Sequence, residues 1–422
     1  MLSHAPPKMQ MLASGRAVVG FRENFWIDQK LTNTWTEVAL DLATNKPALD
    51  QFKAALMKPV FDFKLDHSGG FDMPLPQLMP AKHFCQWLGP SLQNSLRNGE
   101  NQAALDDLLA ALKIPRVLEN DPIVISELVR IAIASINRGS VWEALQADAF
   151  TEQQLALVQA AWEQNTFATN MLRSLRIERA DCEVSFERFR KSNEDTYRCM
   201  FPNWMPFLTS EEDESSHWWQ NAFFRKQIYC RIWRFAWSSQ DERYYLEGMQ
   251  RLIEDQRTGA ERALQNQEEN WWLPFAKAPR QNFYDAWRFG VSAQSLASLS
   301  RATLKSAQAE TQRSLGLCAI ALKRYSLRHG KFPDSLAALV PDFLASVPTD
   351  YMDGKPVKYR RNEDGSFILY SVGEDGKDDG GDGSLPPGKE KSSNLWARKD
   401  FIWPSPATLE EVLAWRKAAG KN

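Results

Sequence analysis

Several residue patterns that identify common classes of protein are missing from this chain of 422 residues. It contains no CxxC pair, and its five cysteines and five histidines are scattered, so the sequence does not predict a zinc site. It has no apolar run of about 18 residues, which a membrane-spanning helix requires. The first residues also lack the charged-then-apolar order of a signal peptide. We therefore expect that membrane attachment is not encoded in the chain as given.

Catalytic and nucleic-acid-binding motifs are also scarce. The formal net charge is -2 and the basic runs are as short as Arg360-Arg361, so no nucleic-acid partner is predicted. The chain contains no G-x-S-x-G, no H-E-x-x-H, no P-loop and no dinucleotide-binding fingerprint. No residue is predicted to be catalytic, and the sequence favours a non-enzymatic protein over an enzyme.

The cysteines are odd in number, so at least one of them is unpaired: Cys85, Cys182, Cys199, Cys230 and Cys318. Buried free thiols are the simplest interpretation, because free cysteine behaves as a small apolar residue. A single disulfide is the alternative if the chain works outside the cytoplasm.

Tryptophan, by contrast, is abundant, with 16 residues. Large aromatic side chains mostly fill cores and helix seams, and this is the main interpretation here. The alternative is a tryptophan-lined groove that would bind a glycan or a substrate. The candidate residues for such a groove are Trp218, Trp219, Trp233, Trp237, Trp271 and Trp272.

Helical periodicity dominates the first three quarters of the chain. Apolar residues recur at helical spacing over residues 36–57, 81–112, 123–145, 151–177 and 302–328. A turn at Gly99 makes the second of these segments a predicted helical hairpin. Thr151 and Gln154 have the spacing of a capping box, and Gly330 predicts the end of the last helix. We expect the helices to pack as a bundle or a short solenoid.

Residues 216–238 are apolar on nearly every side of a predicted helix, and their basic residues are interspersed: Arg225, Lys226, Arg231 and Arg234. This pattern predicts a helix that is buried on several sides. A helix lying on a membrane surface is the alternative, although that would require the basic residues to collect on one face.

The pattern changes after residue 330. A short helix is predicted at 336–344, followed by strands at 355–361 and 366–371 that Asp364-Gly365 joins as a hairpin. The predicted fold is therefore mainly α, with a C-terminal α+β module made of a long helix and a small antiparallel sheet. Four segments are expected: an N-terminal extension (1–35), a helical domain (36–300), the α+β module (301–404) and a C-terminal helix (405–422).

The α+β module carries three motifs in a fixed order. They are Gly330-Lys331-Phe332-Pro333, Asp353-Gly354-Lys355-Pro356-Val357-Lys358-Tyr359 and Tyr370-Ser371-Val372-Gly373-Glu374-Asp375-Gly376. In these motifs residues 302–382 resemble the periplasmic domain of the major pseudopilin of type II secretion systems. Here the module follows some 300 mostly helical residues, which resemble no family that we identify. The whole chain resembles uncharacterised envelope proteins of some bacteria, in which a helical region precedes such a head.

The loop after the second strand is rich in carboxylates and glycines. Four carboxylates fall within eight positions, at Asp375, Asp378, Asp379 and Asp382. Calcium takes six to eight oxygen ligands, and glycines let the backbone turn its carbonyls inwards. The resemblance implies calcium, with Asp375 as a ligand together with one or two later aspartates and backbone oxygens near Val372. Asp400 is a candidate late ligand, and a solvated, flexible acidic loop is the alternative.

These observations predict a non-enzymatic scaffold of the cell envelope, or a secreted one, with a link to secretion. Its calcium-stabilised, pseudopilin-like head is expected to bind a protein partner, and the resemblance implies the bacterial envelope or periplasm as its location. Two alternatives stay open. One is an enzyme or glycan-binding protein that uses the tryptophan-lined groove, and the other is a cytosolic helical-repeat adaptor.

Overall fold

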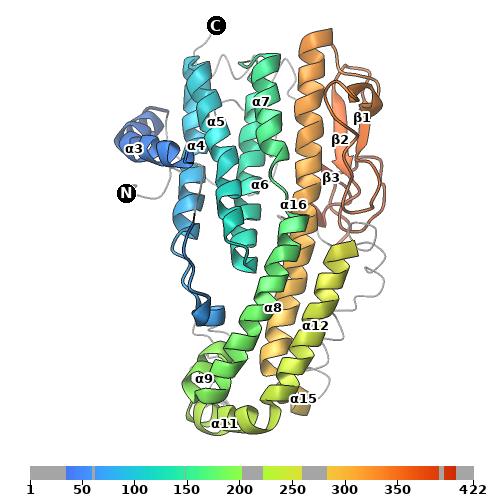
Figure 1. Ribbon diagram of the computed structural model, residues 1–422. Coiled ribbons are helices and arrows are strands. Elements are labelled where there is room, and N and C mark those ends of the chain that lie inside the picture. Colours follow the sequence, from blue (N-terminus) through green and yellow to red (C-terminus); the bar gives the residue numbers. More distant parts are fainter. Residues whose placement is uncertain are drawn as a thin grey trace.

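The computed structural model describes residues 35–58, 62–147, 149–201, 222–258, 283–388 and 394–404. Over these residues the chain is mainly helical, with one three-stranded antiparallel sheet late in the sequence, as predicted. The molecule is elongated, with a helical bundle and the sheet at one end and a second group of helices at the other (Figure 1). One long helix, α16 (Gly290–His329), runs through both ends and joins them.

The end that carries the sheet contains an antiparallel bundle. Its helices are α4 (Leu78–Asn98), α5 (Asn101–Val117), α6 (Val124–Gln146) and α7 (Glu152–Glu163), and the 3-10 turn η2 (Leu118–Asn120) follows α5. The helix α3 (Trp35–Leu56) crosses beside α4, and the 3-10 turn η1 (His67–Asp72) lies against α8 (Ala168–Lys191), toward the other end. The predicted hairpin is α4 and α5, and Gly99 joins them with a φ of 79°, in the left-handed region that favours glycine. The predicted capping box of Thr151 and Gln154 opens α7.

The helix predicted over residues 151–177 is interrupted. α7 ends at Glu163, and α8 (Ala168–Lys191) begins after a short turn. Asn165 holds this turn, because its side-chain amide donates hydrogen bonds to the backbone carbonyls of Leu112 on α5 and Ala161 on α7. A bond to another helix therefore breaks a segment whose own periodicity is continuous.

The other end is built around α8 and a helix with unusual turns. Its elements are α9 (Asn193–Met200), α10 (Ala222–Phe224), η5 (Arg225–Tyr229), α11 (Cys230–Ile232), η6 (Trp233–Trp237), α12 (Ser238–Thr258) and α15 (Phe283–Arg288). The segments η5 and η6 are π-helical, so residues 222–237 form a helix with two wide turns. Aromatic rings of Phe186, Trp233 and Tyr245 fill the core of this end.

The prediction that residues 216–238 form a helix buried on several sides is wrong for the described part, residues 222–237. One face is buried through Tyr229, Cys230 and Trp233. The opposite face is open to solvent at Ile232 and Phe235. The apolar residues around this helix are therefore not all in the core.

The long helix α16 is buried along most of its C-terminal half. Leu315, Cys318 and Leu322 follow one another at spacings of three and four residues, a pattern that predicts one continuous seam along the helix. All three are fully buried. Gly330 ends the helix in the left-handed conformation, as predicted. The predicted domain boundary at residue 300 lies inside α16, because the helix begins at Gly290 and packs against α12, α6 and α7 in turn.

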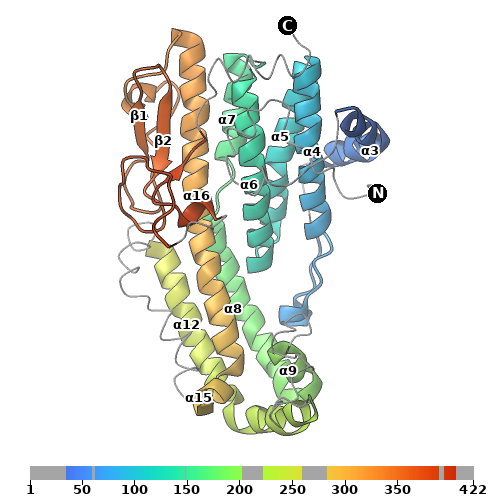
Figure 2. The same cartoon turned by 180° about the vertical axis from the view of Figure 1, so that it is seen from behind.

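The head lies against one side of α16 (Figure 2). Its strands are β1 (Lys358–Arg361), β2 (Phe367–Ser371) and β3 (Phe401–Ile402), in the order β1-β2-β3, with 3-10 turns η7 (Leu336–Leu339) and η8 (Leu395–Ala397). The predicted Asp-Gly hairpin joins β1 and β2, and Gly365 has a φ of 83°. The third strand was not predicted, because it is two residues long and pairs with β2 across a long loop.

All five cysteines are free, and four of them are buried. This confirms the prediction of buried free thiols for Cys85, Cys182, Cys230 and Cys318. None of the helices described here has the length and apolar character needed to span a bilayer.

Candidate functional site

The Asp/Gly loop lies against the face of the head sheet that points away from α16. Gly381 has a φ of 85°, and a Cβ atom there would lie 2.9 Å from Cγ2 of Ile368 on β2. Gly373 has a φ of 70°, and its Cβ atom would lie 2.7 Å from the carbonyl oxygen of Lys399. Glycine at these two positions is thus required both by the backbone conformation and by the close approach of the loop to the sheet.

Asp400, next to β3, holds the loop in place. Its Oδ2 atom accepts hydrogen bonds from the backbone N–H groups of Gly381 at 2.8 Å and Asp382 at 3.0 Å. Its Oδ1 atom accepts a longer bond of 3.4 Å from the N–H of Asp379. Burial raises the pKa of Asp400, and the hydrogen bonds from Gly381, Asp379 and Asp382 oppose that shift. The sequence named Asp400 only as a late calcium ligand.

The carboxylates of Asp375 and Asp378 serve the turns of the loop. Asp375 is exposed, and its Oδ1 atom accepts a hydrogen bond of 3.1 Å from the backbone N–H of Lys377. Asp378 accepts hydrogen bonds from the hydroxyl of Tyr370 at 2.9 Å and from the N–H of Gly380 at 3.1 Å. Each carboxylate is thus engaged with its own part of the loop or sheet.

The remaining predicted ligands differ in their surroundings. Asp379 is exposed to solvent. Asp382 forms an ion pair with Lys399 at 2.6 Å, and this partner lowers the pKa of Asp382 to about 2. Val372 is buried and donates its backbone N–H to the side chain of Asp350 at 3.0 Å.

Calcium at this loop stays a prediction. Among the residues that the structure describes, no three His, Cys, Asp or Glu side chains are arranged so that they could hold a metal ion. The arrangement seen here does not fit a calcium site, because Lys399 pairs with Asp382, and the carboxylates of Asp375 and Asp378 accept hydrogen bonds from backbone and tyrosine donors. Binding would require these carboxylates to turn toward a common centre.

Replacing Asp400 by alanine is expected to destabilise the head by about 2 to 3 kcal/mol, because three backbone donors lose an ionised acceptor. Hydrogen exchange measured by NMR should show faster exchange at the amides of Gly381 and Asp382. The matched control is Asp375→Ala, which removes an exposed carboxylate from the same loop and should leave those amides protected. Equal protection in both variants would contradict the assigned role of Asp400.

A second buried aspartate connects the head to α16. Asp350 accepts hydrogen bonds from the hydroxyl of Ser371 at 2.9 Å and from the N–H of Met352 at 2.9 Å. The hydroxyl of Thr311 on α16 lies 3.3 Å from its Oδ1 atom and itself accepts the N–H of Tyr351 at 3.0 Å. Asp350 thus fixes the start of the hairpin to both β2 and the long helix.

The tryptophan residues predicted to line a groove are only partly described. Trp233 is fully buried, and its indole N–H donates a hydrogen bond of 2.9 Å to Asp241. Trp237 is half-buried, and its ring packs edge-on against Tyr284. Trp218, Trp219, Trp271 and Trp272 lie outside the described residues. The groove hypothesis therefore stays a prediction, and of the two described members Trp233 serves the core.

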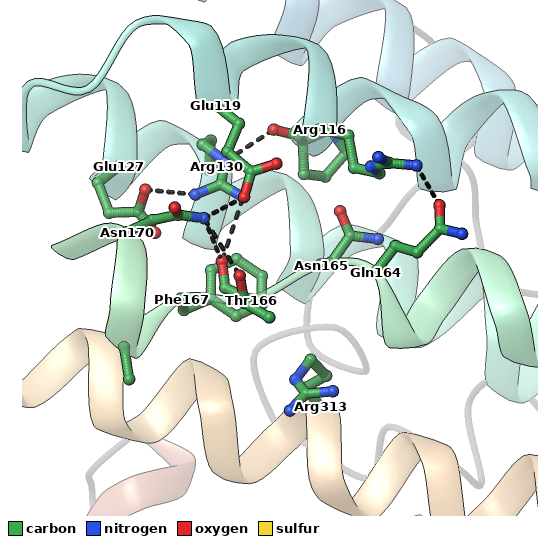
Figure 3. A network of polar contacts seen from close by, with 12 residues as sticks. Arg116, Glu119, Glu127, Arg130, Gln164, Asn165, Thr166, Phe167, Asn170 and Arg313 are labelled. Atoms are coloured by element: carbon green, nitrogen blue, oxygen red, sulfur yellow. Dashed lines mark hydrogen bonds and ion pairs between the residues drawn. The ribbon is translucent and has the colours of Figure 1, made fainter. Parts of the chain in front are cut away.

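A buried charge network lies where α7 turns into α8 (Figure 3). Arg130 on α6 is fully buried, and its guanidinium donates to the carboxylate of Glu127 and to the carbonyl of Pro115 at 2.7 Å. It also reaches the carbonyl of Thr166, at 3.2 Å, and lies over the ring of Phe167. Burial raises the pKa of Glu127, against the attraction of Arg130. The network fixes the turn between the two ends of the molecule.

The same turn is held from the opposite side by α16. The carboxylate of Glu310 accepts the backbone N–H groups of Phe167 at 2.7 Å and Ala168 at 3.1 Å, so it caps the start of α8. Arg313 donates to Glu310 and to the carbonyl of Glu163 at the end of α7. Carboxylates near a helix N-terminus satisfy its free N–H groups and its positive dipole.

Two more buried carboxylates cap helices from a neighbouring helix. Asp241 on α12 accepts the N–H groups of Val291 at 3.0 Å and Ser292 at 3.1 Å, at the start of α16. Glu178 on α8 accepts the N–H of Val124, at the start of α6. Burial raises the pKa of Asp241 to about 6 and that of Glu178 to about 7. Such tertiary caps have no local sequence signature, and the sequence predicted none of them.

An open groove of about 740 Å³ lies between α3, α5 and α7. Its lining includes the side chains of Lys53, Leu109, Lys113 and Arg116. Lys53 is engaged there by Asp107 at 2.8 Å. The groove has an apolar floor but brings no acid–base or nucleophilic pair together, so it defines no reaction.

Comparisons with models of protein families, with curated proteins and with solved structures found no match for this chain. The resemblance to the pseudopilin head therefore depends on the three sequence motifs.

Proposed function

We propose that this chain is a non-enzymatic scaffold of the bacterial cell envelope, or a secreted one, that presents a pseudopilin-like head to a protein partner. The observation that carries this proposal is that buried carboxylates accept hydrogen bonds from the backbone of other segments. Glu310, Asp241, Asp350 and Asp400 each accept backbone N–H groups from another segment, so they join elements. Carboxylates used in this way rigidify a molecule and leave no free acid–base pair for catalysis.

The location and the link to secretion depend on the resemblance of the three head motifs. A pilus subunit of that family uses an N-terminal apolar helix, whereas here the head follows a large helical region. We therefore propose a role in which the head is displayed by the helical bundle and α16. The partner is a protein, because the sequence and net charge favour no nucleic acid.

The proposal extends to the calcium that the sequence predicts at the Asp/Gly loop, which would require the loop carboxylates to turn toward a common centre. Thermal unfolding with calcium and with a chelator tests this part. If calcium binds the folded loop, the melting temperature should rise with calcium by the mass-action relation for a ligand of the native state. Asp375→Ala should abolish that rise, while Asp364→Ala, in the exposed β1–β2 turn, should preserve it. An identical melting curve with calcium and with chelator would remove the metal from the proposal.

The scaffold role is tested separately by cross-linking the head in its native envelope. The head should capture the same protein partner in the wild type and in an Asp353→Ala control. A variant such as Asp400→Ala, which releases the loop, should lose that partner. Full capture of the partner after release of the loop would contradict the proposal that the ordered head presents the binding surface.

A further inference from the structure

An exposed apolar stripe follows the helix of residues 222–237. Its described members are Ile228, Ile232 and Phe235, whose exposed fractions are 43%, 45% and 83%. Phe223, at 70% exposure, begins the same line. Apolar side chains gathered on one side of a helix differ from the single exposed apolar residues that most surfaces carry.

One of the two π-helical turns, η5, contributes to this alignment. Successive members of the stripe are separated by five, four and three residues. An ordinary helix brings residues three or four apart onto one side, and a wide i to i+5 turn does the same for residues five apart. The wide turn η5 (Arg225–Tyr229) lies within the spacing of five. Wide turns of this kind occur frequently at functional sites.

The basic residues of the helix are distributed unequally around it. Lys226 pairs with Glu194 on α9, and Arg234 donates to the carbonyl of Arg190. Arg231 is exposed and lies within the stripe, next to Ile232. No Asp or Glu occurs between residues 222 and 237. The exposed face is therefore apolar with a positive charge.

Aromatic side chains with polar atoms lie at the C-terminal end of the same helix. Tyr284 on α15 is 56% exposed, and its ring packs edge-on against Trp237 at 5.6 Å between ring centroids. Tyrosine and tryptophan favour surfaces where one side is apolar and the other is wet, as at the headgroup level of a bilayer. The helix also lies at the end of the elongated molecule that is opposite to the head (Figure 1). Among the residues that the structure describes, no element of the sheet-bearing end stands between this helix and a flat surface.

A second copy of this chain is a poorer occupant than a membrane. In a symmetric contact each subunit presents the same patch, so Arg231 of one copy would approach Arg231 of the other. Like charges brought together in an apolar contact oppose association. Anionic lipid headgroups would instead pair with Arg231, while the apolar side chains enter the boundary of the acyl chains.

We propose that the face formed by Ile228, Arg231, Ile232 and Phe235 docks this end of the protein onto the surface of an anionic lipid bilayer. This differs from our expectation that the chain encodes no membrane attachment, because the sequence pattern did not show which side of the helix is exposed. The docking is peripheral, and it would hold the head away from the membrane. It does not depend on the proposed scaffold function.

The experiment is co-sedimentation of the full chain with vesicles of phosphatidylcholine mixed with phosphatidylglycerol, and with vesicles of phosphatidylcholine alone. The full chain is used because the acidic residues 211–214 precede this helix in the sequence, so their charge must be present in the test. These four residues lie outside the described part. The wild type should bind the anionic vesicles more tightly. Ile232→Ser combined with Phe235→Ser should weaken that binding at least about tenfold, since two exposed apolar groups no longer enter the bilayer.

The controls use the same changes elsewhere on the surface. Leu157→Ser, at an exposed apolar residue of α7, should bind as the wild type does. Arg231→Glu should remove the preference for anionic vesicles, and Arg301→Glu, at an exposed position of α16, should retain it. Circular dichroism checks that each variant is folded. Absence of vesicle binding, binding that is unchanged in the stripe variants, or a dimer in light scattering that the stripe variants dissociate would each overturn the proposal.

Discussion

Replacing Arg130 by alanine is expected to lower the free energy of unfolding by about 3 to 5 kcal/mol, the usual cost of removing one partner from a buried ion pair. The side chain is fully buried, and its loss leaves the buried carboxylate of Glu127 without its cation and removes a donor from the carbonyls of Pro115 and Thr166. Unfolding by denaturant, followed by far-ultraviolet circular dichroism, measures this change. Because the network fixes the turn before α8, we also expect faster proteolysis between α7 and α8.

The matched control is Arg116→Ala on α5. This arginine is exposed and donates to Gln164, another exposed residue in the same region. Exposed polar contacts contribute little, so the control should lose less than about 1 kcal/mol. Similar losses in the two variants would show that the buried network does not hold the turn. Arg130→Met keeps the length of the side chain and preserves packing without the charge. Its loss in free energy of unfolding should therefore lie between those of Arg130→Ala and Arg116→Ala.

Asp241→Ala is expected to lower the free energy of unfolding by about 3 kcal/mol near pH 5. The dependence of this loss on pH should identify the buried carboxyl group as its cause. The carboxylate accepts the indole N–H of Trp233 and the N–H groups of Val291 and Ser292, and these buried donors would lose their acceptor. The start of α16 would then be uncapped. Denaturant unfolding of the wild type and the variant at several pH values measures the cost.

The sign of the pH dependence follows from the raised pKa. Burial raises the pKa of Asp241 from 3.8 to about 6, so the folded protein binds this proton more tightly than the unfolded chain. The contribution of Asp241 to stability is complete below its unfolded pKa and declines as the pH rises through about 6. Between pH of about 5 and about 7.5, the titration of Asp241 lowers the free energy of unfolding of the wild type by about 1 to 1.5 kcal/mol. It does not affect the variant, which lacks this carboxylate.

The cost of Asp241→Ala should therefore shrink as the pH rises over this range. Glu178, whose pKa burial raises to about 7, is present in both proteins, so its titration cancels in the comparison. A cost that stays constant with pH would mean that Asp241 is ionised with an ordinary pKa in the folded state. A cost that grows with pH would contradict the assigned direction of the shift.

Three regions of this molecule differ in their chemistry. The head carries an ordered loop beside a small sheet, the middle is fixed by buried carboxylates and Arg130, and the far end exposes an apolar stripe. The hydroxyls of Ser292 and Ser371 donate to carboxylates, but both serines are fully buried. The Nδ1 atom of His67 lies 3.3 Å from Asp181, and no described nucleophile contacts this histidine.

The pseudopilin-like motifs predicted the order of the head elements but not the use of the aspartates. The hairpin at Asp364-Gly365 and the helix end at Gly330 follow from residues next to each other in the chain, so the sequence predicted them. Asp400 lies about 20 residues beyond the loop that it holds, and β3 is too short to show a periodicity. Asp375, Asp378 and Asp382, which predicted calcium, accept hydrogen bonds from backbone N–H groups of the loop, and only the folded structure shows this use.

The sequence by itself determined the mainly helical class, the α4–α5 hairpin, the capping box at Thr151, the buried seam of α16 and the β1–β2 hairpin. Each depends on a spacing or a turn residue within a few positions, where local geometry acts directly. Only the tertiary structure decided the break at Asn165, the caps supplied by Glu310 and Asp241, and the exposed side of the helix at 222–237. These depend on which residues, distant in the chain, meet across helices, and periodicity within one segment carries no information about that partner.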